Sequence, residues 1–246
     1  MGMGSGIGPA FRLSLKALAI IAAAALLPAA AVAHDVTEQA QQLMLNGSWA
    51  EVAWIGAEHM LTGYDHLLFL LGVLFFLSGF GQIVRFITAF TVGHTITLLF
   101  ATLTGITANA YLVDAVIALT VCYKAFENLG GFRRWFGVDA PNLLLMVFLF
   151  GLIHGFGLST RLQQITLVED PELVGKILAF NVGVELGQIA ALVVMSLVTR
   201  LWRETDAWQP MTRIANAVLM IAGLVLFALQ IGAFAGVAHP RVEGIS

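Results

Sequence analysis

The sequence predicts an all-α, polytopic membrane protein. Of the 246 residues, 59 % are hydrophobic and only 11 % are charged, which is typical of chains that cross a bilayer several times. The net charge of −3, without a basic patch, gives no reason to expect a nucleic-acid partner. Six apolar segments have spanning length, at 63–80, 86–103, 111–129, 142–160, 173–201 and 212–237.

The N-terminus has the pattern of a secretory signal peptide. Arg12 and Lys16 precede a short apolar run at 17–27, and the triplet 31–33 (Ala-Val-Ala) has the small residues of a cleavage site. We therefore expect cleavage after residue 33. The alternative is that this run remains as an uncleaved first membrane helix.

The stretch that follows, 34–61, is acidic and contains no lysine or arginine, as expected of an exported segment. The predicted organisation is a signal peptide, a periplasmic N-terminal segment, a six-helix transmembrane domain and a periplasmic C-terminal tail, at 1–33, 34–61, 62–238 and 239–246.

Loop charges predict the orientation of the spans. Basic residues gather after the first, third and fifth spans, a bias that marks cytoplasmic loops, whereas the opposite side mixes a few basic residues, such as Arg161, with acidic ones. Both mature termini should therefore be periplasmic. The basic residues concerned are Arg85, Lys124, Arg133, Arg134, Arg200, Arg203 and Arg213.

A short internal similarity favours two groups of three spans. The run 89–94 (Ala-Phe-Thr-Val-Gly-His) in the second span resembles the run 179–184 (Ala-Phe-Asn-Val-Gly-Val) in the fifth. Because three is odd, duplicated halves would have opposite orientations. Inverted repeats of this kind are common in transporters, whose substrate site lies where the repeats meet.

The outer end of the first span carries residues typical of metal sites, His59, Asp65 and His66. On one continuous helix, the two histidines would be about 10 Å apart along the axis, too far to share an ion. Gly63 lies between them, and a break there would bring them together, because glycine tolerates unusual backbone angles. Imidazole and carboxylate without thiolate favour nickel, cobalt or zinc.

Three further ionisable residues lie inside predicted spans, namely His94, His154 and Glu185. Polar side chains within a bilayer are costly and should face the bundle interior. Each histidine could also be an ordinary hydrogen-bonded buried side chain. Together, the expected metal ligands are His59, Asp65, His66, His94, His154 and Glu185.

Other polar residues are candidates for supporting roles. Asn181 and Gln188 fall on the Glu185 face of the fifth span, where they could orient the carboxylate or act as neutral ligands. Glu127, near the cytoplasmic end of the third span, could receive an ion on its way out. Its alternative role is a simple ion pair with Lys124 at helical spacing.

The motifs together resemble the HupE/UreJ family. They are His59-x5-Asp65-His66 and the runs 90–94, 150–157 and 180–188. The resemblance implies a bacterial inner-membrane protein that supplies nickel, or in some members cobalt, to hydrogenase or urease maturation. The second family signature, Phe-His-Gly-x-Ala/Val-His-Gly-x-Glu, is only partly kept, since Gly151 replaces the first histidine and the final glutamate is absent. Glu185 would supply that carboxylate from another helix.

We therefore expect a permease that moves nickel, with cobalt or zinc as alternatives, from the periplasm into the cytoplasm by facilitated diffusion, without an organic cofactor or a nucleotide. Two alternatives remain open. One is an intramembrane zinc hydrolase built on the histidines and Asp65, with Ser159 nearby; the other is a b-type haem protein with His94 and His154 as axial ligands. The exact metal and any homo-oligomer are left undetermined.

Overall fold

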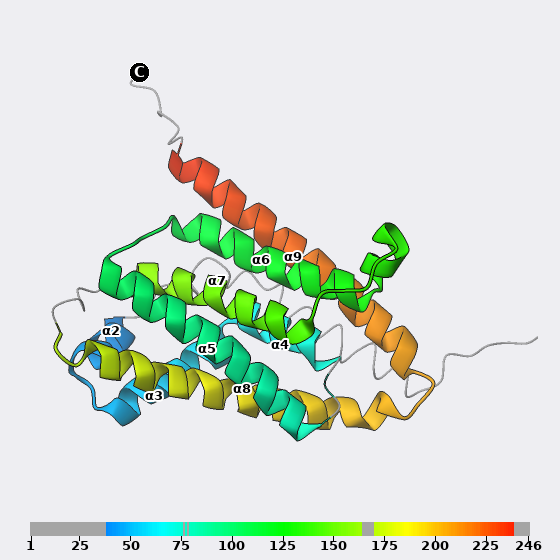
Figure 1. Ribbon diagram of the computed structural model, residues 1–246, viewed down its shortest axis with the longest axis horizontal. Helices are drawn as coiled ribbons and strands as arrows, with labels where there is room; N and C mark the ends of the chain where they lie inside the picture. The colour runs from blue at the N-terminus through cyan, green and yellow to red at the C-terminus, as the bar shows by residue number, and fades with distance from the viewer. Residues whose placement is uncertain (1–37, 76, 78, 164–169, 239–246) are drawn as a thin grey trace, which may run out of the picture.

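The computed structural model describes residues 38–75, 77, 79–163 and 170–238 (Figure 1). The predicted signal peptide and the predicted C-terminal tail lie outside the described residues. The elements are helices α2 (Glu38–Asn46), α3 (Trp49–Thr62), α4 (Tyr64–Leu74), α5 (Phe80–Thr104), α6 (Ala110–Asn128), a π-helical turn η2 (Phe132–Phe136), α7 (Leu143–Gln163), α8 (Leu173–Arg203) and α9 (Trp208–Ala238).

Four of the described helices are long and apolar enough to cross a membrane. They are α5, α7, α8 over Leu173–Arg200 and α9 over Trp208–Gly236. These helices coincide with the second, fourth, fifth and sixth predicted spans. The all-helical fold class and the multi-pass membrane architecture are therefore confirmed.

The other two predicted spans differ from expectation. α4 has 11 residues, so it rises about 16 Å, roughly half of the hydrocarbon core. α6 is long enough, but it carries Asp114, Lys124 and Glu127 along its length. A count of six spans thus stays a prediction, and it requires α3 and α4 to cross the bilayer together.

α3 and α4 are two halves of one broken helix. Ser48 and Glu51 form a capping box that starts α3, and the N–H of Gly63 closes its last turn on the carbonyl of His59. Gly63 then has φ −70° and ψ 103°, which ends the helical path. A side chain at this position would approach Nδ1 of His66, because a Cβ built there lies 2.7 Å from that atom.

The broken helix runs beside α8 along its length and in the same direction. The ring of Trp49 lies against Gly175 near the first ends, and at the far end Arg203 donates to the carbonyls of Leu74 and Leu77. α3 falls in the stretch that the sequence assigns to a periplasmic segment. In the structure, it is packed into the bundle.

α5 and α7 pack with their backbones in contact. Gly151 lies against the carbonyl of Phe90, and Gly93 against the carbonyl of Phe148, so that neither position has room for a side chain. Small residues allow membrane helices this close approach. The two helices run in the same direction, because a second contact farther along joins Gln163 to the carbonyl of Ala101.

α3 and α8 repeat the same contact. Gly56 lies against the carbonyl of Phe180, and Gly183 against the carbonyl of Ala53. The sequences match as well, with Gly-x-x-His in α3 and α7 and Ala-Phe-x-Val-Gly in α5 and α8. α5 and α8 run in opposite directions, so the two helix pairs have opposite orientations. This arrangement supports the predicted inverted repeats, which remain a prediction.

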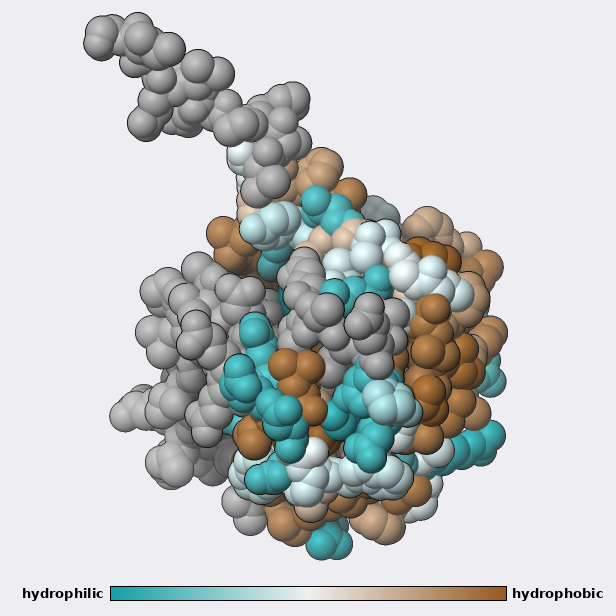
Figure 2. Space-filling view, turned by 90° about the vertical axis from the view of Figure 1, so that its left-hand side faces the viewer, coloured by the Kyte–Doolittle hydropathy of each residue, from teal (hydrophilic) through white to brown (hydrophobic). Residues whose placement is uncertain are grey.

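The surface agrees with a membrane location. Figure 2 looks onto the end of the bundle that carries α2, where hydrophilic side chains spread across the end and hydrophobic ones cover a flank. Large apolar side chains are exposed along the helices, for example Leu186 on α8 and Ile221 on α9, which are both 59 % exposed. Such side chains are expected to face lipid.

Candidate metal-binding site

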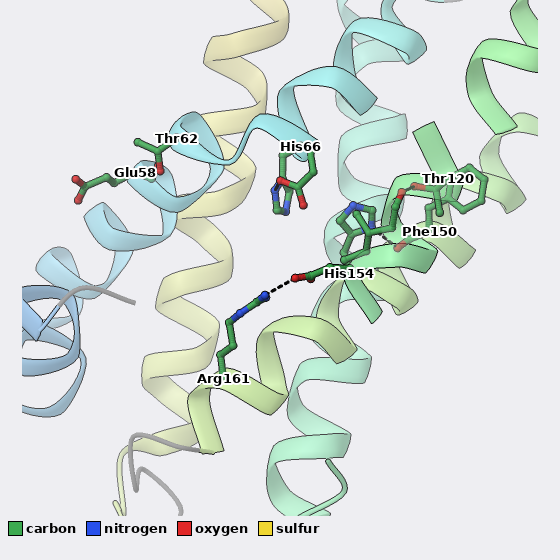
Figure 3. Close-up of polar contacts among 10 residues, drawn as sticks. Glu58, Thr62, His66, Thr120, Phe150, His154 and Arg161 are labelled. Atoms are coloured by element: carbon green, nitrogen blue, oxygen red, sulfur yellow. Dashed lines mark hydrogen bonds and ion pairs between the residues drawn. The ribbon is translucent and has the colours of Figure 1, made fainter. Parts of the chain in front are cut away.

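Three histidine rings from three helices meet in the interior. The ring centroid of His66 on α4 lies 5.2 Å from that of His59 on α3 and 5.2 Å from that of His154 on α7. Figure 3 shows His66 and His154 on their separate helices. The break at Gly63 is what brings His59 and His66 together, as its sequence position suggested.

His66 is held by its neighbour in the chain. Its Nδ1 lies 3.0 Å from Oδ1 of Asp65, and both residues are buried. Because a carboxylate only accepts hydrogen bonds, Nδ1 is the donor. The lone pair of the neutral ring is therefore on Nε2, and the negative charge of Asp65 would partly offset a cation bound there.

His154 is held by its own helix. Its Nδ1 donates to the carbonyl of Phe150 at 2.8 Å, one turn earlier on α7. Its Nε2 is buried and has no hydrogen-bond partner among the residues that the structure describes. A buried nitrogen with an unused lone pair is costly unless something binds it. This atom is accordingly a strong candidate for a metal ligand.

His94 is held from another helix. Its Nδ1 lies 2.7 Å from Oδ1 of Asn181 on α8. The amide nitrogen of Asn181 donates to the carbonyl of Ile177 at 2.8 Å, which fixes the amide with its oxygen toward the histidine. Nδ1 of His94 is therefore a donor, and Nε2 again carries the lone pair.

The ring of Phe90 lies near those of both His154 and His94. Its ring centroid is 5.0 Å from that of His154 and 6.1 Å from that of His94. The residues thus form a row across the bundle interior.

The three buried histidines, His66, His94 and His154, are oriented in the same way. Each has Nδ1 fixed on an oxygen atom and Nε2 left as a potential ligand, which is how metal-binding histidines are usually oriented. In the described part of the chain, no three His, Cys, Asp or Glu side chains are arranged to hold one ion. The arrangement is therefore a series of separate ligands rather than a closed cage.

The remaining predicted residues lie outside this row. Glu185 is half-buried, and its carboxylate accepts a hydrogen bond of 2.7 Å from Thr88 on α5. The hydroxyl of Thr91 donates to Gln188 at 3.2 Å. Asn181 therefore orients His94, and Gln188 bonds to Thr91. In these contacts, neither side chain orients Glu185, which was one of the roles expected of them.

Glu127 is engaged in an ion pair. Its carboxylate lies 2.9 Å from Nζ of Lys124, and the two side chains are 6 % and 1 % exposed. This is the alternative that the helical spacing allowed. Glu127 could receive an ion only if Lys124 moved away.

A buried ion pair beside the site was not expected. Arg161 extends from α7 to Asp114 on α6, with 2.6 Å between Nη2 and Oδ2 (Figure 3). Asp114 and Asp65 line the same small cavity, together with Tyr64. From sequence, Arg161 was placed in an outer loop. The signal in the sequence that could have revealed this pair is that Asp114 and Arg161, which have opposite charges, lie at similar predicted depth at the outer ends of two spans.

Ser159 does not have the setting of a nucleophile. Its side chain is fully buried, and its hydroxyl donates to the carbonyl of Phe156 at 2.8 Å. A hydrolytic serine needs a base within hydrogen-bonding reach, whereas the hydroxyl proton of Ser159 is donated to the carbonyl of Phe156. This contact weighs against a nucleophilic role for Ser159; the zinc hydrolase built on the histidines and Asp65 does not depend on that role.

Comparison with known proteins gives one match. A protein-family model described as "HupE / UreJ protein" matches residues 19–236, most of the chain. No curated protein and no solved structure matches.

Proposed function

This chain belongs to the HupE/UreJ family, which is associated with nickel and cobalt uptake, and we propose that it is a permease for a divalent transition-metal ion, nickel or cobalt before zinc. The observation that carries the proposal is the row of buried histidines whose Nδ1 atoms are anchored and whose Nε2 atoms are left for a ligand. Nitrogen ligands of this kind suit these ions.

The ion is captured between α3 and α4. His59 and His66 supply imidazole nitrogens from the two sides of the break, and Asp65 both orients His66 and contributes negative charge. Charge compensation matters here, because an isolated charge inside a bilayer costs several kcal/mol or more. By the loop charges, this end faces the periplasm.

The ion then passes along the row. Nε2 of His154 receives it from His66, and Nε2 of His94 follows beyond Phe90. Glu185, one helical turn beyond Asn181 on α8, offers a carboxylate farther toward the arginine-rich end. The inside-negative membrane potential favours inward movement by about 2.3 kcal/mol per charge per 100 mV.

The site is completed by movement of the helices. The two matched helix pairs, α3 with α8 and α5 with α7, act as inverted repeats that shift against each other. Gly63 joins α3 to α4, so a small rotation of α4 relative to α3 changes the distance between His59 and His66. An open series of ligands permits release as well as binding.

The test is metal uptake into vesicles. The purified chain is reconstituted into proteoliposomes, and uptake of nickel, cobalt, zinc and copper is compared with that of empty vesicles at an inside-negative potential. Selective, potential-dependent uptake is expected. If no ion moves and the protein instead purifies with stoichiometric zinc, the permease is wrong and a zinc enzyme becomes the better account.

A further inference from the structure

A groove of about 510 Å³ lies between the start of α5 and the end of α8. Figure 1 shows that these two helix ends lie at the end of the bundle away from α2. The groove does not contain any residue of the histidine row. It is lined by Gly79, Phe80, Ile83, Val193, Ser196, Leu197, Arg200, Arg203 and Glu204.

The groove has an apolar part and a cationic part. Phe80 and Leu197 are 63 % and 57 % exposed, although they are large hydrophobic residues. Arg200 and Arg203 also line the groove, and Glu204 is the single carboxylate among its described lining residues. Such a combination suits an amphiphile with an anionic head, because the head would contact the arginines and the tail would contact the apolar side chains.

The two arginines differ in their availability. Arg203 donates to the carbonyls of Leu74 and Leu77 and lies over the ring of Trp208 at 5.5 Å. It is therefore fixed by the protein. Arg200 is exposed, and no hydrogen bond or ion pair between described residues involves it, so we take its guanidinium as the group that a ligand in the groove would meet.

The first turn of α5 adds positive potential to the arginine side. α5 begins at Phe80 after Gly79, and none of the side chains that the structure describes caps it. The first N–H groups of a helix lack partners within the helix and carry partial positive charge, which favours phosphate. Gly79 and Phe80 belong to the groove lining, which places these groups beside the same space as Arg200.

The position of the groove matches the edge of the apolar layer. The apolar stretch of α8 ends at Arg200, and that of α5 begins at Phe80. A phosphate at this level would lie at the membrane surface, while acyl chains would extend along the apolar lining. Basic pockets between membrane helices on the cytoplasmic side commonly bind lipid head groups.

We propose that this groove binds an anionic phospholipid. The phosphate contacts Arg200 and the start of α5, and an acyl chain follows Ile83, Val193 and Leu197. Glu204 disfavours a second negative charge near the rim. The proposal does not depend on the identity of the transported ion or on transport.

The test compares lipid retention by the full purified chain and by single variants. Native mass spectrometry measures bound phosphatidylglycerol and phosphatidylcholine after equal exposure to each. Arg200→Gln is expected to bind phosphatidylglycerol about fivefold more weakly. Arg213→Gln removes an exposed arginine outside the groove lining, and it should bind phosphatidylglycerol as the unaltered protein does.

A second variant tests the apolar part. Ser196→Phe fills the groove without changing its charge and should also reduce phosphatidylglycerol binding. The proposal is overturned if the unaltered protein shows no preference for phosphatidylglycerol, if Arg200→Gln and Arg213→Gln lose it equally, or if Ser196→Phe retains it fully.

Discussion

The ring centroids of His59 and His66 lie 5.2 Å apart, although the two residues are seven positions apart along the chain. On a continuous helix, the same two residues would be about 10 Å apart along the axis. The difference comes from Gly63, where α3 ends and α4 begins. The break is therefore inside the group of proposed ligands, and we expect motion at Gly63 to change how these residues would hold an ion.

Gly63→Ala should impair transport by more than its effect on stability explains. The backbone angles at Gly63 are open to alanine, but the new Cβ would lie 3.0 Å from the carbonyl oxygen of His59 and closer still to His66, so a stability loss of about 1–3 kcal/mol is expected. The added Cβ, however, presses on Nδ1 of His66 and should reduce uptake about tenfold, in line with losses seen when metal-ligating histidines lose their orientation. Initial uptake rates in proteoliposomes measure the effect.

The control for this variant is Gly232→Ala on α9, where a new Cβ meets nothing within 4 Å. It should transport as the unaltered protein does. Equal rates for Gly63→Ala and Gly232→Ala would show that the position of the His66 ring does not matter for transport.

Asn181→Ala should raise the metal concentration needed for uptake. Without Asn181, Nδ1 of His94 loses its acceptor and the ring loses its orientation. Removal of such an orienting group usually costs roughly 10- to 100-fold in metal affinity, and an unpaired buried group costs about 1–3 kcal/mol of stability. The half-saturating concentration of nickel or cobalt reports the first effect.

Asn142→Ala separates the two effects of that variant. Asn142 accepts from the N–H of Leu145 at the start of α7, far from His94 in the sequence, and its loss costs about 1 kcal/mol as a helix cap. Asn142→Ala should unfold at a lower temperature and yet keep its half-saturating concentration. A matching shift in both variants would mean that instability alone explains the result.

The Asp114–Arg161 pair should be strongly coupled in stability. Either Asp114→Asn or Arg161→Gln alone leaves a poorly solvated charge, which costs about 3–5 kcal/mol in buried pairs. The double variant removes both charges and should be less destabilised than the sum of the single variants, by about 1–3 kcal/mol. Thermal unfolding in detergent tests this, and strict additivity would contradict a paired role.

Uptake should fall as the outer pH decreases below about 6. Metal binds neutral imidazole, and protonation removes the lone pair, so binding is present above the histidine pKa and is lost as pH falls through it. Uptake is measured at several external pH values with the membrane potential clamped by potassium and valinomycin. Rates that rise with acidity would instead indicate proton-driven transport.

Much of the fold could be predicted from the sequence because long apolar runs dominate it. α5, α7, α8 and α9 are such runs, and they were confirmed as candidate spans. The apolar run after Gly63 also looked like a full span. The helix observed there, α4, ends at Leu74 and is shorter than a span. In the six-span arrangement, which stays a prediction, α3 would supply the missing length; its acidic residues made it look exported.

The candidate site was less predictable, because its contacts join distant parts of the chain. His59, His66 and the break at Gly63 are local and could be inferred from spacing. The partners of His94 and Asp114 lie 87 and 47 residues away. The sequence around Asn181 does not show whether its side chain binds His94 or Glu185. The packing of α5 on α8 decides this, because it places His94 beside Asn181.

The most direct measurement of the central claim is nickel and cobalt uptake into proteoliposomes by the double variant Asp65→Ala, His66→Ala. Asp139→Ala, which removes an exposed carboxylate in a distant turn, serves as the control. Our account predicts uptake by the unaltered protein and the control, and none above empty vesicles by the double variant. Undiminished uptake by a well-folded double variant would contradict it.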